Sequence, residues 1–244
     1  MKERVTTGLM LLVGILFIFY INSYVLNFII IGVVLYFAMN ESLKIYKLNQ
    51  HKNLVLISLV FYTLTYVTNP VFIAILAILV VASIQAYLKA ESMRLVLPLI
   101  YPMMPIFLLW MLYSQYSIEY LAWLILAIVA SDSGAYFVGK KYGKTPFSPS
   151  SPNKTIQGVL GGLFLGTVVG TMIGNYILEA PIHAAFTSFL ICAFGVFGDL
   201  FESYLKRRAN IKDSGSTLGS HGGVLDRIDG YLFAAPVLLW ALSW

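Results

Sequence analysis

The chain has 244 residues, of which 59% are hydrophobic and only 11% are charged, and its formal net charge is +5. Soluble domains carry about 45–50% apolar and about 25% charged residues, so this composition excludes a single soluble domain and predicts a membrane protein. The single cysteine excludes an internal disulfide, and the sequence lacks the Cys/His cluster that would indicate a zinc site.

Apolar runs long enough to cross, or nearly cross, about 30 Å of hydrocarbon recur along the chain. We place nine helices at Val5–Ile21, Tyr24–Met39, Leu54–Val67, Val71–Leu88, Leu95–Tyr113, Tyr120–Val138, Gly158–Leu178, Ile182–Phe201 and Ile228–Trp244. Turns at Asn22–Ser23 and Asn69–Pro70 join the first four into hairpins, and Pro98, Pro102 and Pro105 should kink the fifth. The sequence therefore predicts an all-α, polytopic integral membrane protein with about nine transmembrane helices.

The basic residues test this count. With nine crossings, all 16 Lys and Arg fall on the side of the N-terminus, whereas the opposite side carries only the acids Glu119 and Glu179. Basic loops stay in the cytoplasm, so we predict a cytoplasmic N-terminus and a C-terminus outside.

We divide the chain into residues 1–113, with about five N-terminal transmembrane helices, and residues 114–244, a catalytic transmembrane region. The second part holds the predicted cytoplasmic loops 139–157 and 202–227. Both loops carry Gly and Ser among their bases, and the second also carries Asp and His. Topology alone does not require those residue types, which indicates a function for the loops.

Two carboxylates lie inside apolar runs near the predicted cytoplasmic ends of their helices, Asp132 in the sixth and Asp199 in the eighth. An aspartate at mid-bilayer costs about 2.5–3.5 kcal/mol on insertion scales, and less near an interface. Such residues usually face a cavity, a partner or a metal. A hydrogen-bonded acid that joins two helices is the alternative, and it stays open for Asp132 in particular.

The segment from residue 203 to residue 229 combines bases, glycines and acids. Lys206, Arg207 and Lys212 supply positive charge, and four glycines (Gly215, Gly219, Gly222, Gly223) would let the backbone approach phosphate oxygens. A loop that only binds anionic lipid explains the bases, but it needs neither the His-Gly-Gly sequence nor paired acids.

The acids complete this pattern. Asp226 and Asp229 are three residues apart at the start of the ninth helix and share one face, and Asp199 can approach them from the end of the eighth. Magnesium takes one or two carboxylates together with substrate phosphates and water. The combination therefore predicts a magnesium–polyphosphate site.

This segment resembles the signature of the phosphatidate cytidylyltransferase family of bacterial type: S-x-hydrophobic-K-R, four residues, K-D, then H-G-G-x-x-D-R-x-D. The matching positions are Ser203, Leu205, Lys206, Arg207, Lys212, Asp213, Ser214, Leu218, His221, Gly222, Gly223, Asp226, Arg227 and Asp229. The resemblance extends upstream through Asp132, Tyr136 and Gly139 to Ser151–Gly158. One departure is Gln157, which stands where the family usually carries an acid in S-P-x-K-T-x-E-G.

The resemblance implies a nucleotidyltransferase that joins CTP to phosphatidate, giving CDP-diacylglycerol and pyrophosphate in an early step of phospholipid synthesis. The enzyme would lie in the plasma membrane, with its active site on the cytoplasmic face and no nucleic-acid partner. Mg²⁺ is the expected cofactor, and the family is also associated with K⁺ in a paired-metal site and with a homodimer.

The resemblance also assigns site residues. Asp199 and Asp226 would be metal ligands, with Asp229 as a third carboxylate or a partner of the ligands. The expected catalytic residues are Asp199, Asp226, Asp229, Lys206 and Lys212. The expected substrate-binding residues are Ser151, Lys154, Thr155, Ser203, Arg207, His221, Gly222, Gly223 and Arg227.

Three alternatives remain open. A transporter or channel would also carry intramembrane acids, although these acids gather at one face beside a phosphate-like loop rather than along a pore. An enzyme of the same kind could act on another lipid phosphate, since relatives use archaeal ether lipids and dolichol kinases also use CTP. Gln157 raises the third alternative, a paralogue with impaired catalysis.

Overall fold

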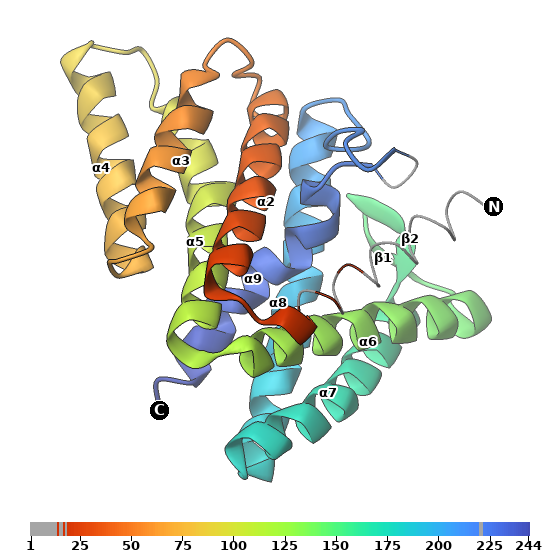
Figure 1. The fold of residues 1–244 in the computed structure, drawn as a ribbon. Helices are drawn as coiled ribbons and strands as arrows, with labels where there is room; N and C mark the ends of the chain where they lie inside the picture. The colour runs from red at the N-terminus through yellow and green to blue at the C-terminus, as the bar shows by residue number, and fades with distance from the viewer. Residues whose placement is uncertain (1–13, 15–16, 18, 220–221) are drawn as a thin grey trace. The chain divides into compact units, whose positions relative to one another are not determined.

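Figure 1 shows the computed structural model of the chain, which describes residues 14, 17, 19–219 and 222–244. Its structure is helical apart from one small hairpin, in agreement with the predicted class. The elements in chain order are α2 (Tyr24–Ile45), α3 (Asn53–Leu64), α4 (Pro70–Tyr87), α5 (Met104–Met111), α6 (Ile118–Tyr142), β1 (Pro146–Ser148), β2 (Ser151–Thr155), α7 (Ile156–Leu178), α8 (Pro181–Arg208) and α9 (Leu225–Ala241).

Six helical segments in the described part of the chain are long and apolar enough to cross a membrane. They are Tyr24–Ile45, Pro70–Tyr87, Arg94–Tyr116, Ile118–Tyr142, Ile156–Leu178 and Pro181–Arg208, and each overlaps one predicted run. The third and ninth runs correspond to α3 and α9, which are 12 and 17 residues long. The first run, Val5–Ile21, lies mostly outside the described residues. The count of nine crossings and the orientation of the termini stay predictions.

The predicted turns and the predicted kink are confirmed. The side chains of Ser23 and Asn69 accept hydrogen bonds from the first turns of α2 and α4, and Pro70 occupies the start of α4. The fifth segment is interrupted at Tyr101, whose φ of −145° and ψ of 114° are not helical and which precedes Pro102. Proline removes a backbone donor and clashes with the preceding turn, so the helix restarts after this point.

The chain forms two compact units. The first contains residues 1–114 and 213–227, and the second contains residues 115–212 and 228–244. In the first unit Phe28 stacks on Tyr62 with ring centroids 4.4 Å apart, and Trp110 Nε1 donates to the carbonyl of Thr65 at 3.2 Å. The 213–227 segment therefore belongs with the N-terminal helices, although it comes from the other end of the chain.

Small residues let α6 and α7 pack closely in the second unit. Glycines recur at every fourth position of α7, and all five are buried (Gly158, Gly162, Gly166, Gly170, Gly174). A Cβ atom built at Gly162 would lie 2.6 Å from the carbonyl oxygen of Ser131 in α6. This small-residue packing is typical of membrane helices, where close backbone approach replaces the hydrophobic effect as the driving force. Trp123 Nε1 also donates to Ser188 Oγ at 3.0 Å, which ties α6 to α8.

The two predicted cytoplasmic loops contain more regular structure than the sequence indicated. β1 and β2 pair in antiparallel fashion between α6 and α7, with Pro146 opposite Thr155 and Ser148 opposite Ser151. Helix α8 continues to Arg208, seven residues beyond the predicted end at Phe201. It ends where Asn210 adopts a φ of +59° and Ile211 N donates to the carbonyl of Lys206 at 3.0 Å, a common helix stop.

Candidate active site

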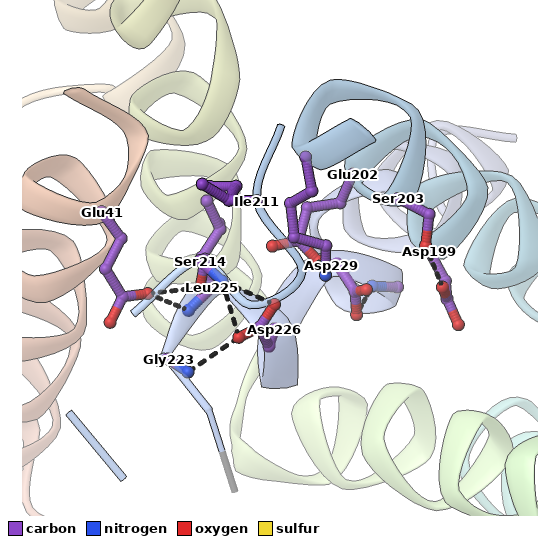
Figure 2. A network of polar contacts seen from close by, with 12 residues as sticks. Glu41, Asp199, Glu202, Ser203, Ile211, Ser214, Gly223, Leu225, Asp226 and Asp229 are labelled. Atoms are coloured by element: carbon purple, nitrogen blue, oxygen red, sulfur yellow. Dashed lines mark hydrogen bonds and ion pairs between the residues drawn. The ribbon is translucent and has the colours of Figure 1, made fainter. Parts of the chain in front are cut away.

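Asp199 gathers two of the other predicted site residues around its carboxylate. Ser203, one turn later on the same face of α8, donates to Oδ1 at 3.3 Å, and the ammonium of Lys154 forms an ion pair with Oδ2 (Figure 2 shows Asp199 and Ser203). Lys154 comes from β2, so the hairpin delivers a cation to the membrane helix. The side chains of Lys154 and Asp199 are 30% and 32% exposed, which leaves both groups accessible to a ligand.

The hairpin is fastened to the start of α7 by Thr155 and Gln157. Thr155 Oγ1 accepts from the N–H of Gly158 at 3.1 Å and caps α7. Gln157 Oε1 accepts from the N–H groups of Lys144 and Thr145 at 3.1 and 3.3 Å. Thr155 was predicted to bind substrate, and the structure gives its hydroxyl oxygen the role of a helix cap. Ser151, at the start of β2, is half-buried.

Asp226 lies in the first turn of α9, where it holds the preceding segment by its backbone. Both carboxylate oxygens accept from Ser214 N, at 3.1 and 3.0 Å, and Oδ2 also accepts from Gly223 N at 2.7 Å (Figure 2). An anion is favoured at this position because the helix N-terminus carries partial positive charge. Gly222 has a φ of +84°, a backbone conformation that residues with a side chain rarely adopt. This conformation explains why a glycine stands at position 222. The N–H of Gly223 points to Asp226, and its role in binding substrate phosphate stays a prediction.

Asp229 lies one turn further along α9 and next to the turn that carries Asp199. A Cβ atom at Gly198 would collide with the backbone of Asp229, so α8 and α9 touch at this point. Asp229 Oδ1 accepts from the N–H of Gly230 at 2.8 Å. Within the second unit, the structure therefore brings the turns of Asp199 and Asp229 together.

The predicted basic residues differ in their surroundings. Lys206 is buried, and its ammonium donates to Glu202 Oε2 at 3.1 Å; its catalytic role stays a prediction. Arg207 is exposed, and its Nη1 donates to the carbonyl of Ile211 at 3.3 Å. Lys212 and Arg227 are exposed, and His221 lies outside the described residues.

Two acids that the sequence did not single out are buried. Glu202 is fully buried in α8 beside Lys206, and Glu41 is 2% exposed in α2. Glu202 precedes Lys206 by four residues in the chain, and Glu41 lies two residues after the predicted run that ends at Met39. Asp132, which the sequence did single out, lies on the exposed surface of α6.

The expected magnesium ion needs oxygen ligands. Among the described residues, no group of three or more His, Cys, Asp or Glu side chains could hold a metal ion by itself. Asp199 and Asp226 nonetheless offer carboxylate oxygens, the ligand type that magnesium prefers. Each of these carboxylates, taken within its own unit, suits an ion that takes one or two protein ligands and completes its shell with phosphate and water.

The sequence was then compared with known proteins. It matches the model of the cytidylyltransferase family over residues 2–244. The chain belongs to the cytidylyltransferase family. A phosphatidate cytidylyltransferase of Helicobacter pylori is 40% identical over 236 residues, which cover 96% of this chain and 89% of that protein. Proteins of the same name from Bacillus subtilis and Thermotoga maritima are 41% and 48% identical over 134 and 115 residues, covering 53% and 43% of this chain and 49% and 42% of their own lengths.

The structure explains the departure at Gln157. Its side-chain oxygen accepts both hydrogen bonds from the backbone of residues 144 and 145, as a glutamate oxygen would, and its Nε2 donates to Thr145 Oγ1 at 3.5 Å, a hydroxyl that can itself donate to a glutamate. We expect Gln157→Glu to keep activity within about twofold of wild type or to raise it, because charge-assisted bonds are stronger than neutral ones. Steady-state turnover of CTP measures this. Gln157→Leu, which removes the acceptor, serves as the contrast and should lose activity; a large loss in Gln157→Glu would show that the amide itself is needed.

Proposed function

We propose that this chain is a phosphatidate cytidylyltransferase, an enzyme that makes CDP-diacylglycerol and pyrophosphate from CTP and phosphatidate. The observation that carries the proposal is the 40% identity to a protein of that name over 96% of the chain. The hydrogen-bonded acids in α8 and α9 and the paired lysine of β2 give the reaction a chemical basis.

The reaction needs little proton transfer. A phosphate oxygen of phosphatidate attacks the α-phosphorus of CTP, a new P–O bond forms, and the bond to the bridging oxygen of pyrophosphate breaks. The nucleophile is already an anion near neutral pH. The protein's tasks are to bring two polyanions together, to align them and to neutralise charge on the leaving group.

We assign these tasks to charged side chains at the ends of α8 and α9. Lys154 supplies an accessible ammonium, and the exposed bases Arg207, Lys212 and Arg227 supply further charge for phosphates. Asp199 and Asp226 would hold Mg²⁺, with Asp229 close by in sequence and, in the second unit, beside the turn of Asp199. When bound, the magnesium ion would offset charge on the transferred and leaving phosphates.

The membrane setting suits the two substrates. CTP is soluble, and the phosphatidate headgroup lies at the interface between water and lipid. We propose that the site faces the cytoplasm of a bacterial plasma membrane, because all 16 Lys and Arg fall on one side of the predicted topology. Nine crossings, a homodimer and a second, monovalent ion are further proposals from the family resemblance.

A panel of lipid acceptors tests the proposed function. Purified protein in detergent, given Mg²⁺ and radiolabelled CTP, should transfer label to phosphatidate and not to diacylglycerol, phosphatidylglycerol or a prenyl phosphate. Phosphatidylglycerol is a matched control because it keeps the acyl chains but lacks a free phosphate monoester. Transfer to a prenyl phosphate or to diacylglycerol in preference to phosphatidate would contradict the proposal.

A further inference from the structure

Glu41 makes an unusual number of long-range contacts for a residue in a membrane helix. It lies near the end of α2 and is 2% exposed. Its carboxylate accepts four hydrogen bonds, all from the 213–227 segment of the same unit, and Figure 2 shows those from Ser214 and Leu225. The donors are Ser214 Oγ at 2.9 Å, Thr217 Oγ1 at 2.8 Å, Val224 N at 3.0 Å and Leu225 N at 2.8 Å.

Two glycines of the segment are explained by this carboxylate. A Cβ atom at Gly215 would lie 2.7 Å from Glu41 Oε1, and one at Gly223 would collide with both Glu41 and Ser214. Approaches this close force the neighbouring atoms to move. Gly223, the second glycine of the His-Gly-Gly sequence, therefore makes room for an internal anion, and its contact with a substrate phosphate stays a prediction.

The charge of Glu41 is balanced by dipoles. Within the described residues it forms no ion pair. Two of its four donors are the N–H groups of Val224 and Leu225 at the start of α9, where the helix dipole favours an anion. A buried charge is tolerated only when hydrogen bonds satisfy it. Moving any of the four donors away from Glu41 would therefore cost free energy, and this cost holds the donors in place.

A short chain of hydrogen bonds joins Glu41 to Asp226. Ser214 donates its hydroxyl to Glu41 and its backbone N–H to both oxygens of Asp226. Gly223, which packs on Glu41, donates its N–H to Asp226 at 2.7 Å. Glu41 thus fixes both groups that orient the Asp226 carboxylate, without being one of the predicted substrate or metal contacts itself.

We propose that Glu41 is a positioning residue for cytidylyl transfer, which holds the 213–227 segment so that Asp226 is set for the magnesium–CTP complex. This inference rests on the proposed function and on the role given there to Asp226. It assigns the N-terminal helices a part in the chemistry beyond spanning the membrane.

Glu41→Gln tests the proposal. The amide keeps the size but can no longer accept all four bonds, and its NH₂ group must face donors. We expect kcat to fall about 10- to 100-fold, the range caused by small misplacements of reacting groups, and the Mg²⁺ concentration for half-maximal activity to rise at least about threefold. Trypsin cleavage after Lys212 or Arg227, measured in detergent without substrates, should become about tenfold faster because the segment opens more easily.

Two further variants keep the test decisive. Thr217→Val removes one of the four bonds and should show the same changes at smaller size, about threefold, even if Glu41→Gln fails to fold. Gln85→Ala is the matched control, because Gln85 is also 2% exposed in the same unit but donates to Ser92 instead. It should leave the Mg²⁺ dependence and the cleavage rate of the segment within about twofold of wild type.

The outcomes separate the two proposals. Loss of kcat together with a higher Mg²⁺ concentration for half-maximal activity and faster cleavage supports positioning by Glu41. Faster cleavage with unchanged kcat and Mg²⁺ dependence would overturn it, because Glu41 would then be structural only, and unchanged values of all three would overturn it as well. If wild-type protein does not turn over CTP, the proposed function fails together with the catalytic role of Glu41, and the cleavage rates still report whether Glu41 holds the segment.

Discussion

Asp199→Asn is expected to lower CTP- and phosphatidate-dependent release of pyrophosphate by about 10²- to 10³-fold, the range found when a preorganised electrostatic group is removed from an active site. Asparagine keeps the shape of the side chain and still accepts from Ser203. It removes the charge that pairs with Lys154 and that would bind the metal ion. Turnover of purified protein over a range of Mg²⁺ concentrations measures the effect.

The matched control is Glu119→Gln, which removes an exposed carboxylate from the first turn of α6, at the predicted outer side. It should leave turnover within about twofold of wild type, as is usual for surface positions away from a site. Near-normal turnover of Asp199→Asn at saturating Mg²⁺ would remove Asp199 from the metal site.

Asp226→Asn should cause a loss of similar size for a partly different reason. Both oxygens of Asp226 accept backbone N–H groups, so the amide nitrogen of asparagine would face a donor and loosen the segment before α9. Thermal unfolding in detergent should be recorded beside turnover, so that the loss of charge is separated from the loss of fold.

Lys154→Met is the second large effect that we expect, a fall in kcat/KM for CTP of about 100-fold. Methionine keeps much of the hydrocarbon stem and removes the ammonium that the hairpin brings to Asp199. Because both side chains are about one-third exposed, solvent screens the pair, and its contribution to folding stability should be small. The loss should therefore appear in catalysis and leave the unfolding temperature nearly unchanged.

The double variant Lys154→Met/Asp199→Asn shows what Lys154 does. If Lys154 only balances the charge of Asp199, the double variant should be as active as Asp199→Asn alone. We expect it to be less active, because Lys154 would also meet substrate phosphate. Lys144→Met, which removes an exposed lysine from the same connection, is the control and should behave like wild type.

Much of the fold could be predicted from the sequence, because uninterrupted apolar runs indicate membrane helices. The described helices α2 to α9 coincide with eight of those runs, and the prolines near Tyr101 mark the break in the fifth segment. The hairpin of β1 and β2 was not predicted, since its sequence is rich in Pro and Ser and has no alternating pattern. The predicted run ends at Phe201, where the apolar residues end, but α8 continues because Glu202, Leu205 and Lys206 all favour helix.

The candidate site was predictable where its residues are close in sequence. The acids at positions 226 and 229 and the bases before them form a recognisable pattern, and the structure pairs Lys154 with Asp199 across 45 positions. Glu41 is 173 positions from Ser214, and nothing in its neighbourhood in the chain indicates a buried carboxylate. The role of such a residue can be recognised only from the folded structure, in which donors distant in sequence surround its carboxylate. The same holds for Gly223, whose close neighbour in the folded chain is that carboxylate.

The position of the label in the products tests the central claim most directly. Purified protein should be given phosphatidate and CTP labelled with ³²P at either the α- or the γ-phosphate. We predict that α-label passes into the lipid fraction, whereas γ-label leaves CTP as pyrophosphate, which stays in water. Asp199→Asn should abolish both conversions. Passage of γ-label into the lipid would reveal a kinase, and retention of both labels in CTP would contradict cytidylyl transfer to phosphatidate altogether.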